Sequence, residues 1–331
     1  MFPGLVAADL DCYLPQKWRS NVFNRERLEV KQKLLALARE VGADLSASDG
    51  SPLSIEASVE HPALWNHKQV DSQSIYFSRN EAARRELDSI IDRQKPITTL
   101  LDDPTPQRNH IFLCLTLTHE GLDVSLKLHP DARVDRQNLE RKIEDHFECE
   151  RLISLLSDLP EEFCIGITPE RQPIAGVLEV DALRALVAKL PPATGASPPP
   201  VPSPSQVPVA RLFYIGRSLQ RAALFGPDGT PLMDGAAVTR WVRQGLLMLL
   251  PVYHFIAWSR DNDFVSMRQV LDRQKVVKRQ RGLGKNDPVR IVRGVLAGKT
   301  GVVQEVDARG QLRVLVGKMT VKVDAADVER P

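Results

Sequence analysis

The stretch from 287 to 307 reads Asp287-Pro-Val-Arg-Ile-Val-Arg-Gly-Val-Leu-Ala-Gly-Lys-Thr-Gly-Val-Val-Gln-Glu-Val-Asp307, and it decides the fold of the C-terminal part of the chain. Val289 and Ile291 alternate with polar residues, which is the pattern of a half-buried strand, and a second apolar run covers 302–306. Glycines between the two runs allow a tight turn. The segments 312–316 and 320–323 supply two further strands. We therefore predict a small β-barrel over residues 287–331.

The order of strand, glycine turn and strand resembles the KOW motif of the transcription factor NusG, of its eukaryotic counterparts and of several large-subunit ribosomal proteins. The turn residues of this motif are Gly294, Leu296, Gly298 and Gly301. The resemblance covers roughly an eighth of the chain and implies an SH3-like β-barrel that contacts RNA, a ribonucleoprotein or a protein partner. NusG-type sequences carry Pro-Phe after the glycine that corresponds to Gly294, whereas Val295 and Leu296 stand here.

Basic residues crowd the segment before the predicted barrel. From 268 to 293, nine basic residues face two acidic ones, a net charge of +7 in a chain whose total is +2. We predict a basic helix or connector over 268–286 that neutralises phosphates. A solvated helix that only links domains is the alternative. The residues assigned to nucleic-acid binding are Arg273, Lys275, Lys278, Arg279, Arg281, Lys285, Arg290, Arg293 and Lys299.

One segment of the motif has a misleading likeness to a nucleotide-binding loop. Residues 294–300, GVLAGKT, have three residues between the glycine and Gly-Lys, whereas a P-loop needs four. A β run follows where a P-loop requires a helix N-terminus. Nucleotide binding at this segment is therefore not expected.

A proline-rich stretch divides the chain. Residues 191–208 hold eight prolines among small polar residues, a composition typical of an extended linker. We predict an α+β multidomain protein with five parts: a mixed helix and sheet domain over 1–190, the linker over 191–208, a small helix-containing domain over 209–267, the basic connector over 268–286 and the SH3-like barrel over 287–331.

Apolar periodicity places the elements of the first two domains. A 3.6-residue period indicates helices at 30–45, 80–92 and 135–156 and after Asp181, with Gly42 near the end of the first helix and Asp135 as the cap of the third. Alternation indicates strands at 53–59, 74–78, 163–167 and 174–178, and a hairpin formed by 111–118 and 122–128. After the linker we expect a strand within 211–219 and a helix that Asp234 caps.

The richest polar cluster of the N-terminal domain is the candidate for an enzymatic site. Its residues are His67, Lys68, Asp71, Tyr76, Ser78 and Arg79. His61 and His67 lack a third ligand, and so no metal site and no cofactor are predicted. Asp123, Ser125 and Lys127 share one face of a strand, which favours a solvent-facing surface over a nuclease centre.

Composition bounds the remaining classes. The near-neutral total charge favours local over global affinity for nucleic acid. No signal peptide and no transmembrane helix are expected, and four cysteines without CxxC spacing fit a reducing cytoplasm. We predict a non-enzymatic accessory factor that binds RNA, a ribonucleoprotein or the transcription or translation machinery. The alternatives are an N-terminal enzyme, possibly acting on nucleic acid, that the barrel targets, and a pure protein-interaction adaptor.

Overall fold

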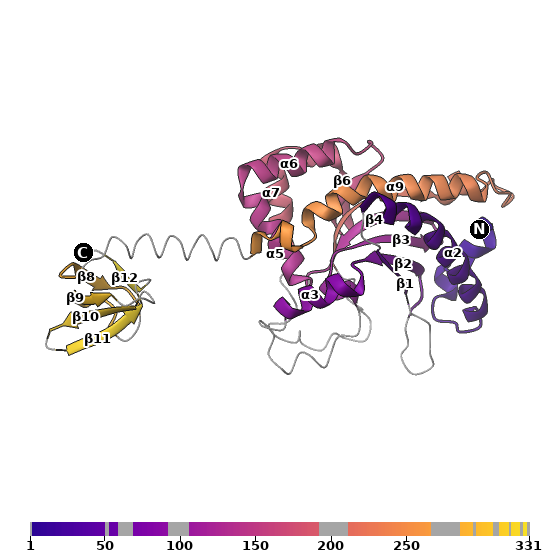
Figure 1. The fold of residues 1–331 in the computed structure, drawn as a ribbon. Coiled ribbons are helices and arrows are strands. Elements are labelled where there is room, and N and C mark those ends of the chain that lie inside the picture. Colours follow the sequence, from indigo (N-terminus) through magenta and orange to yellow (C-terminus); the bar gives the residue numbers. More distant parts are fainter. Residues whose placement is uncertain are drawn as a thin grey trace. The chain divides into compact units, whose positions relative to one another are not determined.

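The computed structural model describes residues 2–49, 53–58, 69–91, 106–191, 211–265, 285–293, 296–306, 311–317, 319–324 and 327–329. The chain divides into two compact units, residues 1–263 and 264–331. The described residues of each unit include one antiparallel sheet, and the helices whose bounds are given below lie in the first unit (Figure 1). The expected mixture of helices and strands is confirmed.

The first unit is built on a seven-stranded sheet with the order β1-β2-β3-β4-β7-β5-β6. The predicted hairpin is confirmed, since β3 and β4 pair with Leu113 opposite Leu126. The strands are β1 Ser54–Ala57, β2 Ser72–Ser78, β3 Phe112–Thr118, β4 Gly121–Leu128, β5 Cys164–Ile167, β6 Glu170–Pro173 and β7 Phe213–Gln220.

Two long helices, α2 and α9, cover one face of this sheet (Figure 1). The side chains of Leu115, Val124 and Ile215 alternate toward that face and are completely buried. The helices are α1 Ala7–Asp11, α2 Asn24–Asp49, α3 Glu81–Ile91, α4 Pro106–Asn109, α5 Arg133–Glu144, α6 His146–Ser157, α7 Val180–Ala188, α8 Arg221–Leu224 and α9 Gly235–Ile256. None of the helices within the described ranges is long and apolar enough to cross a membrane.

Residues 211–263 belong to the first unit, which corrects the prediction of a separate domain over 209–267. Strand β7 lies between β4 and β5 and pairs with both of them in antiparallel register. Helix α9 packs on the sheet with α2. A strand at the centre of a sheet must share one core with its neighbours, and so the proline-rich stretch does not separate two domains. Residues 192–210 lie outside the described ranges.

Three further elements differ from the expected ones. The helix predicted over 135–156 is two helices, because the side chain of Asp145 accepts a hydrogen bond from the Glu148 amide and starts α6. Helix α2 continues past Gly42 to Asp49. The predicted strand over 174–178 is a short 3-10 helix, Ile174–Val177, and the preceding residues form β6 instead. Asp234 caps α9 as predicted, accepting from the Ala237 amide at 2.7 Å.

The second unit is a curled antiparallel sheet with the order β11-β10-β9-β8-β12. Its core contains Val289, Val303, Leu312 and Val314, whose side chains are completely buried. The four predicted strands are present, and β12 was not predicted. The strands are β8 Pro288–Ile291, β9 Thr300–Val306, β10 Gln311–Val316, β11 Met319–Asp324 and β12 Val328–Glu329.

Two glycines, Gly298 in the turn between β8 and β9 and Gly301 within β9, are required for different reasons. Gly298 has a φ of +86°, in the left-handed region that favours glycine. Gly301 has no such backbone angle, but a Cβ there would lie 2.6 Å from the carbonyl oxygen of Leu315. Gly301 therefore permits the close approach of β10. Leu296 packs partly buried on the core, and Gly294 lies outside the described residues.

Candidate functional site

The outer surface of the C-terminal sheet gathers polar side chains from β9, β10 and β11. Since side chains alternate along a strand, Val303 and Val314 point into the core while Arg313 points outward. Arg313 lies opposite Glu305 on one side and Lys322 on the other. Its Nη1 donates to Glu305 Oε2 at 3.1 Å.

An irregularity in β9 shapes this surface. The register shifts between Arg313 and Val314, so Gln304 stands in β9 without an opposite residue in β10. Thr320 on β11 donates a hydrogen bond to Gln304 Oε1 at 3.1 Å. Beside the shift lies an open hollow of about 870 Å³. Its lining residues are Lys285, Gln304, Glu305, Val306, Arg313, Thr320 and Lys322.

Three cations and one carboxylate line the hollow, which makes it a positive surface. Lys285 was predicted as a nucleic-acid-binding residue, and the structure places it in this lining. Arg313 and Lys322 were missed. The signal for them was present, because both alternate with buried or half-buried aliphatic residues and must face outward. We refer to Lys285, Arg313 and Lys322 with the polar residues Gln304 and Thr320 as the basic face.

The other predicted nucleic-acid-binding residues are not all gathered at this face. Arg290, Arg293 and Lys299 are exposed on β8 and in the turn after it, but they do not line the hollow. Arg273, Lys275, Lys278, Arg279 and Arg281 lie outside the described residues.

The described residues of the polar cluster predicted in the N-terminal domain make separate contacts. Asp71 is exposed, and the ring of Tyr76 packs edge to face on Phe112 with centroids 5.3 Å apart. Ser78 is buried and accepts a hydrogen bond from Arg84 at 3.0 Å. His67 and Lys68 lie outside the described residues, as does His61. Among the residues of this prediction that the structure describes, only Arg79 enters the larger polar network of the first unit.

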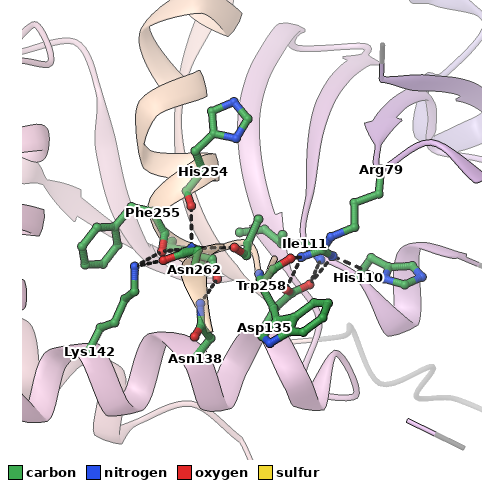
Figure 2. Close-up of polar contacts among 12 residues, drawn as sticks. Arg79, His110, Ile111, Asp135, Asn138, Lys142, His254, Phe255, Trp258 and Asn262 are labelled. Carbon is green, nitrogen blue, oxygen red and sulfur yellow. Dashed lines mark hydrogen bonds and ion pairs between the residues drawn. The ribbon is translucent and has the colours of Figure 1, made fainter. Parts of the chain in front are cut away.

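That network is centred on a buried ion pair (Figure 2). Arg79, just after β2, forms a bidentate pair with Asp135 in the first turn of α5. Asp135 also accepts from the backbone amides of Ile111 and Trp258, each at 2.8 Å. Burial raises the pKa of Asp135, but the Arg79 charge and these hydrogen bonds outweigh it and lower the pKa. The carboxylate therefore stays ionised and holds three segments of chain together.

The same network satisfies the C-terminal end of α9. The last carbonyls of a helix have no partner within the helix. Asn138 donates to Ile256 O at 3.1 Å, Lys142 donates to Phe255 O at 2.8 Å, and Asn262 donates to His254 O at 2.8 Å. Asp135, Asn138 and Lys142 recur at three and four residues on one face of α5, which Figure 2 shows turned toward α9. The positive charge of Lys142 also suits a helix C-terminus.

Lys142, on the same face of α5, also has a perturbed pKa. Its side chain is 1% exposed, and burial lowers its pKa to about 8, although Glu148 opposes the shift from 3.7 Å away. It also lies 4.1 Å from the centroid of the Phe255 ring. A cavity of about 660 Å³ adjoins it, with Arg79, Arg151, His254 and Trp258 among its lining. Lys142 contacts the carbonyl oxygen of Phe255 and the side chains of Asn262 and Glu148, which indicates a role in holding the end of α9.

The sheet face opposite the helices has a smaller polar cluster. Asp123, Ser125 and Lys127 share this face, as predicted from the strand period. Ser125 is completely buried, however, and Asp123 accepts from Tyr214 Oη at 2.6 Å, from Ser125 at 2.7 Å and from Ser218 at 3.0 Å. Within the described ranges, no group of three or more His, Cys, Asp or Glu residues is placed to hold a metal ion. The cluster therefore ties neighbouring strands together.

No protein-family model matches the chain, and no curated protein matches it. A function must therefore be argued from the residues and geometry of the two units.

Proposed function

We propose that the protein is a non-enzymatic accessory factor that binds RNA through a KOW-type barrel in its C-terminal unit. The observation that supports this most is the division of charge between the two units. Residues 264–331 contain fifteen basic and seven acidic side chains, a net charge of +8. Residues 1–263 contain twenty-nine basic and thirty-five acidic side chains, a net charge of −6.

This division localises the attraction for a polyanion. Phosphates that contact Lys and Arg release counterions, and this term supplies most of non-specific binding. The first unit repels a polyanion, so the attraction must come from the C-terminal unit. The basic face offers Lys285, Arg313 and Lys322 around one hollow, with Gln304 and Thr320 as additional hydrogen-bonding groups.

The first unit supports an adaptor role more than a catalytic one. Arg79, Asp135 and Lys142 are engaged with the backbone around the end of α9. Asp123 is engaged with three hydroxyl groups of the sheet. These polar groups stabilise the fold, and the unit is proposed to contact another component of the assembly that the C-terminal unit joins.

The test is to measure RNA binding by the full chain at several salt concentrations. The fluorescence anisotropy of a labelled RNA of mixed sequence reports the binding. For about three to five neutralised phosphates on a single strand, the slope of log affinity against log salt should be roughly −2 to −3.5. The double variant Arg313→Gln, Lys322→Gln should weaken binding and flatten the slope by about 1.4.

A matched control removes two positive charges from the first unit instead. Arg25 and Arg85 have side chains that are 88% and 77% exposed, and each pairs with a glutamate one helical turn away. Arg25→Gln, Arg85→Gln should leave the slope unchanged. Absence of RNA binding at low salt, or equal effects of the two double variants, would contradict the proposal.

A further inference from the structure

Beyond Phe264 at its first position, the C-terminal unit lacks the aromatic side chains on which single-stranded bases stack. The sequence from Val265 to Pro331 contains no Phe, Tyr, Trp or His. Proteins that bind single strands combine a basic groove with aromatic side chains, and each stacked base contributes roughly tenfold or more in affinity. The apolar residues on the outer side of the sheet, such as Val302 and Leu315, are aliphatic.

From this composition and the geometry of the basic face we infer that the C-terminal unit binds double-helical RNA, through its sugar and phosphate backbone, in preference to single strands. The inference rests on the proposed function, because it names the class of RNA that the same face takes.

Charge density favours the duplex. A duplex presents phosphates on two strands at fixed positions, whereas a single strand must be ordered on binding and gains no stacking in return. Each neutralised phosphate contributes about 0.9 to the salt slope on a duplex and about 0.7 on a single strand, by values measured for DNA. Arg313 and Lys322 are cross-strand neighbours on β10 and β11, so their charges project side by side toward one backbone.

The polar residues beside these cations suit RNA. Double-stranded RNA is recognised through phosphates and 2′-hydroxyls across a wide, shallow minor groove. Gln304 and Thr320 are exposed beside the cations, with an amide and a hydroxyl that can bond a 2′-hydroxyl. The hollow is open and broad, in keeping with a shallow groove more than with an inserted base.

The experiment measures the affinity of the full chain for three labelled ligands. The first is an RNA duplex of about 16 base pairs, which is the length that a double-stranded RNA module spans. The second is one strand of this duplex, with a sequence that forms no structure by itself, and the third is the DNA duplex of the same sequence. At one fixed salt concentration the RNA duplex should bind at least tenfold more tightly than the single strand. Changing its base sequence should alter its affinity less than threefold. Arg313→Gln, Lys322→Gln should flatten its salt slope by about 1.8, and Arg25→Gln, Arg85→Gln should not.

The possible outcomes separate this inference from the proposed function. Equal or tighter binding of the single strand overturns the inference and leaves RNA binding standing. The RNA duplex should bind more tightly than the DNA duplex, and equal binding of the two overturns the contacts of Gln304 and Thr320 with 2′-hydroxyls. Failure of all three ligands to bind at low salt overturns the proposed function itself.

Discussion

Arg79 and Asp135 lie 56 residues apart in the chain and meet in a bidentate ion pair whose side chains are 6% and 0% exposed. Both residues also bond the backbone of Trp258, just beyond α9: Asp135 accepts its amide, and Arg79 donates to its carbonyl oxygen at 2.9 Å. Three distant segments are therefore fixed at one buried point.

Loss of the Asp135 charge should strongly destabilise the first unit. Asp135→Asn leaves the Arg79 charge buried without a counter-charge, which typically costs about 3–5 kcal/mol. All four tryptophans lie within residues 1–263, so tryptophan fluorescence during urea denaturation reports on this unit alone.

Glu29→Gln is the matched control for Asp135→Asn. It makes the same chemical change in an exposed ion pair, between Arg25 and Glu29 at 3.5 Å. Glu29→Gln should lower the free energy of unfolding by less than about 0.5 kcal/mol. Similar costs for the two variants would show that the buried pair does not hold the unit together.

The pH dependence of stability should reveal the buried amine of Lys142. Its pKa is about 8 in the folded chain against an ordinary value of 10.5, so between these pH values the unfolded chain binds the proton and the folded chain does not. The free energy of unfolding should therefore rise with pH in this window, by roughly 1–3 kcal/mol relative to Lys142→Met. Urea denaturation of both proteins from pH 7 to pH 10.5 gives the difference. A difference that stays constant with pH would contradict the lowered pKa.

Cleavage of the proline-rich stretch should not separate the two parts that it joins. A specific protease site inserted after Gly195 should be cut readily, because the proline-rich, small and polar composition of 191–208 is typical of an extended linker. The fragments should elute together in size-exclusion chromatography, since β7 pairs with both β4 and β5. Residues 1–190 expressed alone should be unstable or insoluble. A folded, monomeric 1–190 fragment would argue against the shared sheet.

Gly298 in the turn and Gly301 in β9 should respond differently to substitution. Gly298→Ala should cost about 1–2 kcal/mol because of its left-handed φ, and Gly298→Asn should cost less because Asn tolerates this region. Gly301→Val should destabilise the C-terminal unit by roughly 1–3 kcal/mol through the clash with β10. Hydrogen exchange of peptides from 285–331 measures both. Equal tolerance of Ala and Asn at 298 would contradict the backbone reason.

Local signals in the sequence determined most elements of this protein. The hairpin of β3 and β4 follows from two alternating apolar runs joined by a short turn, and Asp234 marks the start of α9 because a helix N-terminus needs an acceptor. The strands of the C-terminal sheet follow from the same two-residue period. The outward position of Arg313 could have been predicted in this way too.

The tertiary structure alone decided which elements share a core. The apolar residues of Phe213–Gln220 indicate a largely buried strand, but they do not specify β4 and β5 as its neighbours. The pairing of Arg79 with Asp135 is equally invisible in the sequence, because a polar residue at the end of a strand or the start of a helix is usually exposed or a cap. The spacing of apolar residues indicates which side of a helix or strand is buried. Which other element covers that side depends on packing between residues far apart in the chain.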